Sequence, residues 1–124
     1  MAFILYRSHA LVRPRTPDEA RIWIDSRQRN KAADLTGFLH RVEDTFIQAL
    51  EGPPVTINGL MIRLRRDRRH EALEIMHYDR EDQIRLFPEW SMGFSDDPQE
   101  FDPLAVGAER AIRCLLDAAR RQMA

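Results

Sequence analysis

The sequence predicts an α+β fold: a ferredoxin-like β-α-β-β-α-β-β sheet with two helices on one face, followed by a C-terminal helix. Segments of period-two and of helical periodicity follow one another in that order. Right-handed crossovers would place both intervening helices on the same face of the sheet. The length of 124 residues, with 44% hydrophobic and 31% charged residues, is typical of one globular domain.

The first strand and the first helix have clear local signals. Residues 2–8 are apolar and contain neither Gly nor Pro, which predicts a strand with Tyr6 on the face toward the helices. A helix is expected over about 17–33, with a proline at its first position. Thr16 can cap this helix, and Glu19 is expected to complete a capping box.

A hairpin is predicted next. Two strands, over about 35–42 and 45–51, are separated by the short link 43–44, which lacks the glycine that tight hairpins prefer. In the second of these strands Gln48 lies on an otherwise apolar face. A buried amide must find hydrogen-bond partners, so Gln48 is conspicuous there.

The second half of the chain supplies a helix and two strands. A helix is expected over about 54–66, since apolar residues repeat at i, i+3, i+4 and i+7. Strands are expected over 72–78 and 85–94, although Pro88 has no amide hydrogen, so the latter strand starts after it or lies at an edge. The last strand carries three large alternating residues: Trp90, Met92 and Phe94.

The chain is expected to divide into a domain over 1–95 and an appendage over 96–124, a polar linker followed by an amphipathic helix. The sheet face away from the two helices is also apolar and must be covered. The C-terminal helix or a second subunit is the expected cover. The residues of that face are Phe3, Leu5, Ile47 and Ala49.

Composition excludes several classes of function. Nineteen basic and twenty acidic residues give a net charge of −1, which argues against a nucleic-acid binder. The single cysteine, Cys114, cannot form an intrachain disulfide, and neither a signal peptide nor a membrane span is recognisable. We therefore expect a soluble, cytoplasmic protein. No phosphate-binding loop, metal-ligand spacing or catalytic triad is present.

Three polar residues point inward on the predicted elements: Tyr6, Asn30 and Gln48. One interpretation is structural, in which the three satisfy loops, helix ends or one another. The other is a ligand between the two helices, recognised by amide groups that both donate and accept hydrogen bonds.

Six segments match a known family in order and spacing, over about residues 2–94. They are Leu5–Ser8, Ser26–Asn30, Leu35–Leu39, Phe46–Gly52, Arg66–His70 and Phe87–Phe94. Each segment alone is weak evidence for a family, but the six together resemble the BLUF domains, blue-light sensors that use FAD. The resemblance implies a flavin held between the two helices, with FMN or riboflavin as further options in a preparation.

The resemblance also implies roles for individual residues. Tyr6 matches the electron-donating tyrosine, Gln48 the glutamine that rotates or tautomerises beside the flavin, and Asn30 the asparagine at the flavin O4/N3 edge. Trp90 and Met92 match the fifth-strand residues that relay the signal. The other expected flavin contacts are Ile22, Phe46 and Leu50 as apolar walls, Asp67 and Arg69 at the far edge or ribityl chain, and Arg29 at a position where relatives vary.

The implied function is a photoreceptor without its own catalytic activity. Light-driven electron and proton transfer from Tyr6 would rearrange the hydrogen bonds of Gln48, and the last strand and C-terminal helix would pass the change to a protein partner or a homo-oligomer. Two alternatives remain: a light-independent ferredoxin-like interaction module, and a small hydrolase of the acylphosphatase type.

Overall fold

The computed structural model describes residues 1–81, 84–88, 91–96, 102 and 105–123. Its element order is the predicted one. The elements are β1 (Ala2–Ala10), α1 (Pro17–Ala32), β2 (Thr36–Val42), β3 (Thr45–Gly52), α2 (Pro54–Arg66), β4 (His70–Asp79), β5 (Gly93–Ser95) and α3 (Ala108–Met123). Within these residues, no helix combines the length and the apolar character that crossing a membrane requires.

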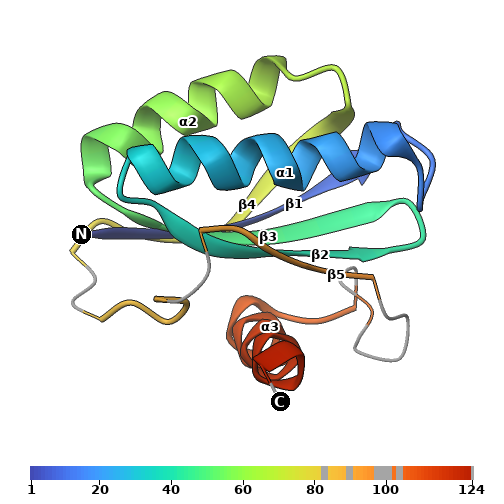
Figure 1. Ribbon diagram of the computed structural model, residues 1–124. Helices are drawn as coiled ribbons and strands as arrows, with labels where there is room; N and C mark the ends of the chain where they lie inside the picture. Colours follow the sequence, from blue (N-terminus) through green and yellow to red (C-terminus); the bar gives the residue numbers. More distant parts are fainter. Residues whose placement is uncertain (82–83, 89–90, 97–101, 103–104, 124) are drawn as a thin grey trace.

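The five strands form one mixed sheet in the order β4-β1-β3-β2-β5. Neighbouring strands are antiparallel, except that β5 runs parallel to β2 at the edge. In the register of the central pair, Tyr6 of β1 lies directly opposite Gln48 of β3. Figure 1 shows α1 and α2 on one face of the sheet and α3 on the other.

The sheet therefore has a core on each face. The core under α1 and α2 contains Ile4, Leu39, Phe46, Leu50, Ile57, Met61 and Met92. On the opposite face, the four residues predicted to need a cover pack against α3, whose Ala111 and Leu115 are fully buried. The expectation that the C-terminal helix covers this face is confirmed.

The capping box at the start of α1 forms only in part. Thr16 Oγ1 accepts a hydrogen bond from the Glu19 backbone N–H at 3.3 Å, as predicted. The Glu19 carboxylate does not return to Thr16; it accepts from the Arg15 N–H at 2.9 Å and from Arg41 Nη1 at 2.8 Å. Since Arg41 is buried, its charge needs a carboxylate partner, and this requirement determines the position of Glu19.

The last strand is much shorter than the predicted 85–94. The backbone N–H groups of Leu86 and Phe87 donate to the buried carboxylate of Glu51 instead of to a neighbouring strand. Pro88 follows directly and offers no N–H. The predicted bounds 85–94 are wrong because a side chain replaces the backbone ladder at residues 86 and 87. The expectation that the strand starts after Pro88 is confirmed, since β5 begins at Gly93 and lies at the edge of the sheet.

Candidate functional site

A cavity lies between the sheet and the helices α1 and α2. It surrounds about 350 Å³ of empty space, part of which is open to solvent. Its walls are mostly apolar, with a few polar groups that converge on it. The lining residues are Tyr6, Ile22, Ser26, Arg29, Leu39, Phe46, Gln48, Leu64, Asp67, Arg69 and His70.

A chain of hydrogen bonds runs through the floor of this cavity. The Tyr6 hydroxyl donates to Gln48 Oε1, and Gln48 Nε2 donates to the Met92 sulfur at 3.2 Å. All three side chains are at least 95% buried. Burial, together with the negative charge of Asp67, raises the pKa of the Tyr6 phenol far above its ordinary value. Tyr6 is therefore a neutral hydrogen-bond donor.

Histidine 70 packs against the edge of Tyr6. Its Nε2 lies 2.6 Å from the Leu64 carbonyl oxygen, and its Nδ1 lies 2.7 Å from Ser8 Oγ. A carbonyl only accepts, so Nε2 carries a proton, and in the neutral ring Nδ1 accepts from the serine hydroxyl. The His70 and Tyr6 ring centroids are 6.2 Å apart in an edge-on arrangement. This fixed ring therefore helps hold Tyr6 in place.

Asp67 and Arg69 form an ion pair at the α2 side of the cavity. Arg69 donates to the Asp67 carboxylate from its backbone N–H, Nε and Nη2, with a shortest distance of 2.7 Å. Burial alone would raise the pKa of Asp67. The hydrogen bonds and the charge of Arg69, with a smaller electrostatic contribution from His70, outweigh burial and lower it. Both groups are thereby held in their charged forms.

Asn30 is buried near the C-terminal end of α1, beside the cavity rather than in its lining. Its Nδ2 donates to the Ser91 carbonyl oxygen at 2.8 Å, so it ties α1 to the segment that enters β5. Asn30 also lines an adjoining hollow between α1 and α2. The two amides singled out in the sequence therefore both contact the segment that leads into β5, Asn30 at Ser91 and Gln48 at Met92.

The structure brings most of the expected site residues together. Seven of them line the cavity: Tyr6, Ile22, Arg29, Phe46, Gln48, Asp67 and Arg69. Met92 contacts Gln48 directly. Leu50 does not line the cavity; it pairs with Ile4, one alternate position beyond Tyr6 and Gln48, and packs in the core. Trp90 lies outside the described residues.

Sequence reasoning did not assign several lining residues to the site: Ser26, Leu39, Leu64 and His70. Two of them had usable signals. Leu39 lies opposite Gln48 in the predicted hairpin, and Leu64 belongs to the apolar stripe of α2. His70 had none, since its contact with Ser8 joins residues 62 positions apart in the sequence.

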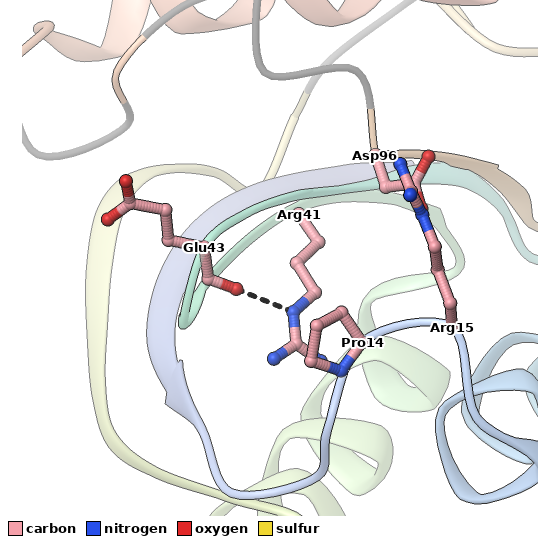
Figure 2. A pocket seen from close by; sticks show the side chains of 5 residues that line it. All are labelled: Pro14, Arg15, Arg41, Glu43 and Asp96. Atoms are coloured by element: carbon pink, nitrogen blue, oxygen red, sulfur yellow. Dashed lines mark hydrogen bonds and ion pairs between the residues drawn. The ribbon is translucent and has the colours of Figure 1, made fainter.

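A second hollow, of about 500 Å³, is lined by Pro14, Arg15, Arg41, Glu43 and Asp96. Figure 2 shows Arg41 donating through Nε to the Glu43 carbonyl oxygen, a bond of 2.7 Å, while the Glu43 carboxylate points away. Arg41 is also paired with Glu19. The polar groups of this hollow serve the fold. In the described part of the chain, no group of three or more His, Cys, Asp or Glu side chains could hold a metal ion.

The cavity suits a flat heteroaromatic ring with amide-like edges. Ile22, Leu39 and Phe46 supply apolar walls, and the Gln48 amide both donates and accepts hydrogen bonds. Arg29 Nε is buried there without a hydrogen-bond partner among the described residues, so the structure leaves a donor for a ligand. These residues fit a flavin.

Comparisons with known proteins agree with this fit. The family model "BLUF: Sensors of blue-light using FAD" matches residues 1–93. The photoactivated adenylate cyclase subunit beta of Euglena gracilis is 36% identical over 66 residues, 52% of this chain and 8% of that protein. The subunit alpha of the same organism is 40% identical over 43 residues, 35% of this chain and 4% of that protein. The chain thus spans less than a tenth of these relatives.

Solved structures show the same fold. The dark state of BlrB, described as a BLUF protein, superposes with a TM-score of 0.83 at 23% identity and covers 94% of this chain and 96% of that one. The BlsA ground state gives 0.82 at 20% identity, covering 93% and 87% of the two chains. Because the family model accounts for three-quarters of the sequence, the protein belongs to the BLUF family of blue-light sensors that use FAD.

Proposed function

We propose that this blue-light sensor holds the flavin ring in the cavity between α1 and α2, and that Tyr6 and Gln48 are its light-driven switch. The observation that carries the proposal is the buried chain of hydrogen bonds from Tyr6 through Gln48 to Met92. It connects an oxidisable phenol to the strand that leads toward α3. Ile22 and Phe46 would enclose the ring, and Asn30 and Gln48 would bind its polar edge.

The chemistry of the switch follows from the two ends of the Gln48 amide. A bound flavin supplies a blue-light chromophore whose excited state withdraws an electron from a nearby phenol. In this proposal Tyr6 donates the electron. Its hydroxyl becomes a strong acid when the electron leaves, so the hydroxyl proton moves along the hydrogen bond to Gln48 Oε1. The proton returns from Gln48 Oε1 to Tyr6 together with the electron, so no covalent bond has changed, and the amide is then left in a turned orientation.

The turned amide loses its contact with Met92. In the structure, Gln48 directs its NH₂ group at the Met92 thioether, which is a weak acceptor. After a turn, Gln48 would present its carbonyl oxygen to that sulfur, and a thioether has no proton to donate. The hydrogen bond between β3 and the entrance of β5 is then absent, which is how a local change would reach the edge strand.

Beta strand β5 connects this change to α3. Phe94 stacks on Trp23 of α1 with ring centroids 5.7 Å apart, and its carbonyl oxygen accepts a hydrogen bond from Gln122 Nε2. A shift of β5 would therefore alter the contact with the last turns of α3. We propose that α3 passes the signal to a downstream protein or to a second copy of the chain, without enzymatic activity of this domain. The single cysteine fits a reducing compartment, the cytoplasm.

Two tyrosines make a controlled test, because Tyr6 is buried in the cavity and Tyr78 is exposed on β4. Flavin-loaded wild type and Tyr78→Phe should show a reversible red shift of the flavin bands under blue light. Tyr6→Phe and Gln48→Leu should keep the flavin but show no such shift. A Tyr6→Phe protein that converts as the wild type does would contradict the proposed donor.

A further inference from the structure

The crevice between α1 and α2 continues beyond the ring cavity as two adjoining hollows. One, of about 420 Å³, is lined by Arg29, Leu60, Arg63, Leu64, Arg66 and Asp67. The other, of about 870 Å³, includes Asn30, Thr56 and Gly59. Arg29 of α1 and Arg63 of α2 line both hollows, and Arg29 also lines the ring cavity. The two arginines therefore stand where a ligand tail would leave the ring cavity.

The positive charges of Arg29 and Arg63 are not neutralised by contact with a carboxylate of a described residue. Burial, then the charges of Arg63 and Arg69, lower the pKa of Arg29, against smaller opposing effects of Asp25 and Asp67. Asp67 is already bound by Arg69 through several hydrogen bonds. In the part of the chain that the structure describes, neither Arg29 nor Arg63 takes part in a salt bridge.

The unused donors of Arg29 strengthen this observation. Its Nε is buried and has no hydrogen-bond partner among the described residues. A buried donor without an acceptor costs free energy, so an arrangement that keeps one calls for an acceptor from outside the chain. An anion placed between α1 and α2 would accept from Arg29 and offset its repulsion with Arg63. Guanidinium groups bind phosphate through paired hydrogen bonds, which ammonium groups do not reproduce.

We propose that Arg29 and Arg63 bind the phosphate next to the ribityl chain of the flavin, so that the protein selects a phosphorylated flavin over riboflavin. This inference rests on the proposed position of the ring in the neighbouring cavity. FMN and FAD share that phosphate and riboflavin lacks it. The preference is therefore for the phosphate, and the adenosine of FAD lies beyond the two arginines.

The test compares the affinities of flavin-free protein for riboflavin, FMN and FAD, measured by equilibrium dialysis. The variants are Arg29→Gln and Arg63→Gln. Arg65→Gln is the matched control, since Arg65 is an exposed arginine on the same helix as Arg63 and lines neither hollow. We expect the wild type to bind FMN and FAD about ten-fold more tightly than riboflavin, the effect of one charge-assisted contact. Arg63→Gln should lose most of that preference and keep its affinity for riboflavin, since Arg63 does not line the ring cavity. Arg29→Gln should lose the preference as well, and because Arg29 also lines the ring cavity its riboflavin affinity can fall too.

Two further measurements distinguish binding of the phosphate from binding of the flavin ring. Inorganic phosphate should compete with FMN and leave riboflavin binding unchanged, and added salt should weaken FMN binding more than riboflavin binding. Equal wild-type affinities for all three flavins would overturn the phosphate site alone. So would an Arg63→Gln protein that loses riboflavin affinity in the same proportion, or a loss of preference in Arg65→Gln as large as in Arg63→Gln. Failure of all three flavins to bind would overturn the ring site and this inference together.

Discussion

At the scale of single residues, Met92 determines the direction of the hydrogen bonds that run from Tyr6 through Gln48. Its thioether accepts from Gln48 Nε2 in the structure and cannot donate to Gln48 Oε1. The arrangement therefore favours one orientation of the Gln48 amide over the other. The favoured orientation is the one in which Tyr6 donates to the amide oxygen.

Met92→Leu removes this preference at nearly constant volume, a substitution that usually costs less than about 1.5 kcal/mol of stability. Because only the dark orientation loses a hydrogen bond, thermal recovery after blue light should slow by a few-fold. Recovery of the flavin absorption bands in the dark measures it. Met61→Leu is the control, a buried methionine of the same core; the described hydrogen bond of Gln48 to a sulfur goes to Met92. Equal recovery rates in wild type and Met92→Leu would contradict the role given to Met92.

The Asp67–Arg69 pair predicts a pH effect. Its hydrogen bonds hold the pKa of Asp67 below the ordinary 3.8, so the ionised carboxylate stabilises the folded state above that pH. This contribution is lost as the pH falls through the lower folded-state pKa. Urea unfolding of flavin-free wild type and Asp67→Asn should differ by up to about 1 kcal/mol at neutral pH and converge in acid. A difference that stays constant from neutral pH into strong acid would contradict this.

At the scale of elements, α2 contains a residue that weakens it. Gly59 lies inside the helix, and a Cβ at this position would meet no atom within 4 Å. Gly59→Ala should therefore stabilise the flavin-free chain by roughly 0.5–1 kcal/mol, as measured by urea unfolding. Gly37→Ala should do the opposite, since its Cβ would lie 2.1 Å from the Ala49 carbonyl oxygen. A destabilised Gly59→Ala variant would show that the hollow beside it is not open.

Local patterns predicted the elements that use regular backbone pairing. The period-two alternation of residues 2–8 and 45–51 placed Tyr6 and Gln48 on the same face, and the sheet register brings them opposite each other. The same reasoning failed for 85–94, where the Glu51 carboxylate takes the backbone donors. No rule of periodicity identifies an acid that replaces a neighbouring strand, because its partners lie 35 and 36 residues away in the sequence.

Beta strand β4 shows a second limit. The sequence predicted a strand over 72–78, whereas β4 begins at His70. Its register against β1 shifts twice, and Ala72 has a φ of 54°, a conformation that favours glycine. These irregularities place half-buried residues at every third position, at His70, Leu73 and Met76. His70 reaches the Tyr6 ring by this route, which explains why its place at the site was not predicted.

At the scale of the whole molecule, the two faces of the sheet have different roles. One face holds the cavity. The other is covered by α3, which Figure 1 shows on the side of the sheet away from α1 and α2. Strand β5 has contacts on both sides of the sheet, because its Phe94 touches Trp23 of α1 and Gln122 of α3. An amphipathic pattern predicts that α3 packs on an apolar face, but not which carbonyl its last turns contact.

This arrangement predicts a light effect at a distance. Blue light should increase amide hydrogen exchange in β5 and in the last turns of α3, while the centre of α3 around Leu115 stays protected in its core. Hydrogen exchange of flavin-loaded protein in the dark and under illumination measures this. In Gln48→Leu the two patterns should coincide. Equal exchange of α3 in dark and light in the wild type would exclude it as the output element.

The most direct test of the account observes the Gln48 amide itself. The protein is grown with ¹³C-labelled glutamine side chains, and the light-minus-dark infrared spectrum is recorded for wild type, Gln48→Leu and Gln28→Leu, an exposed glutamine of α1. We predict a label-sensitive carbonyl band that changes reversibly in wild type and Gln28→Leu and is absent in Gln48→Leu. Flavin bands that still shift in wild type without any label-sensitive change would contradict the claim that light rearranges Gln48.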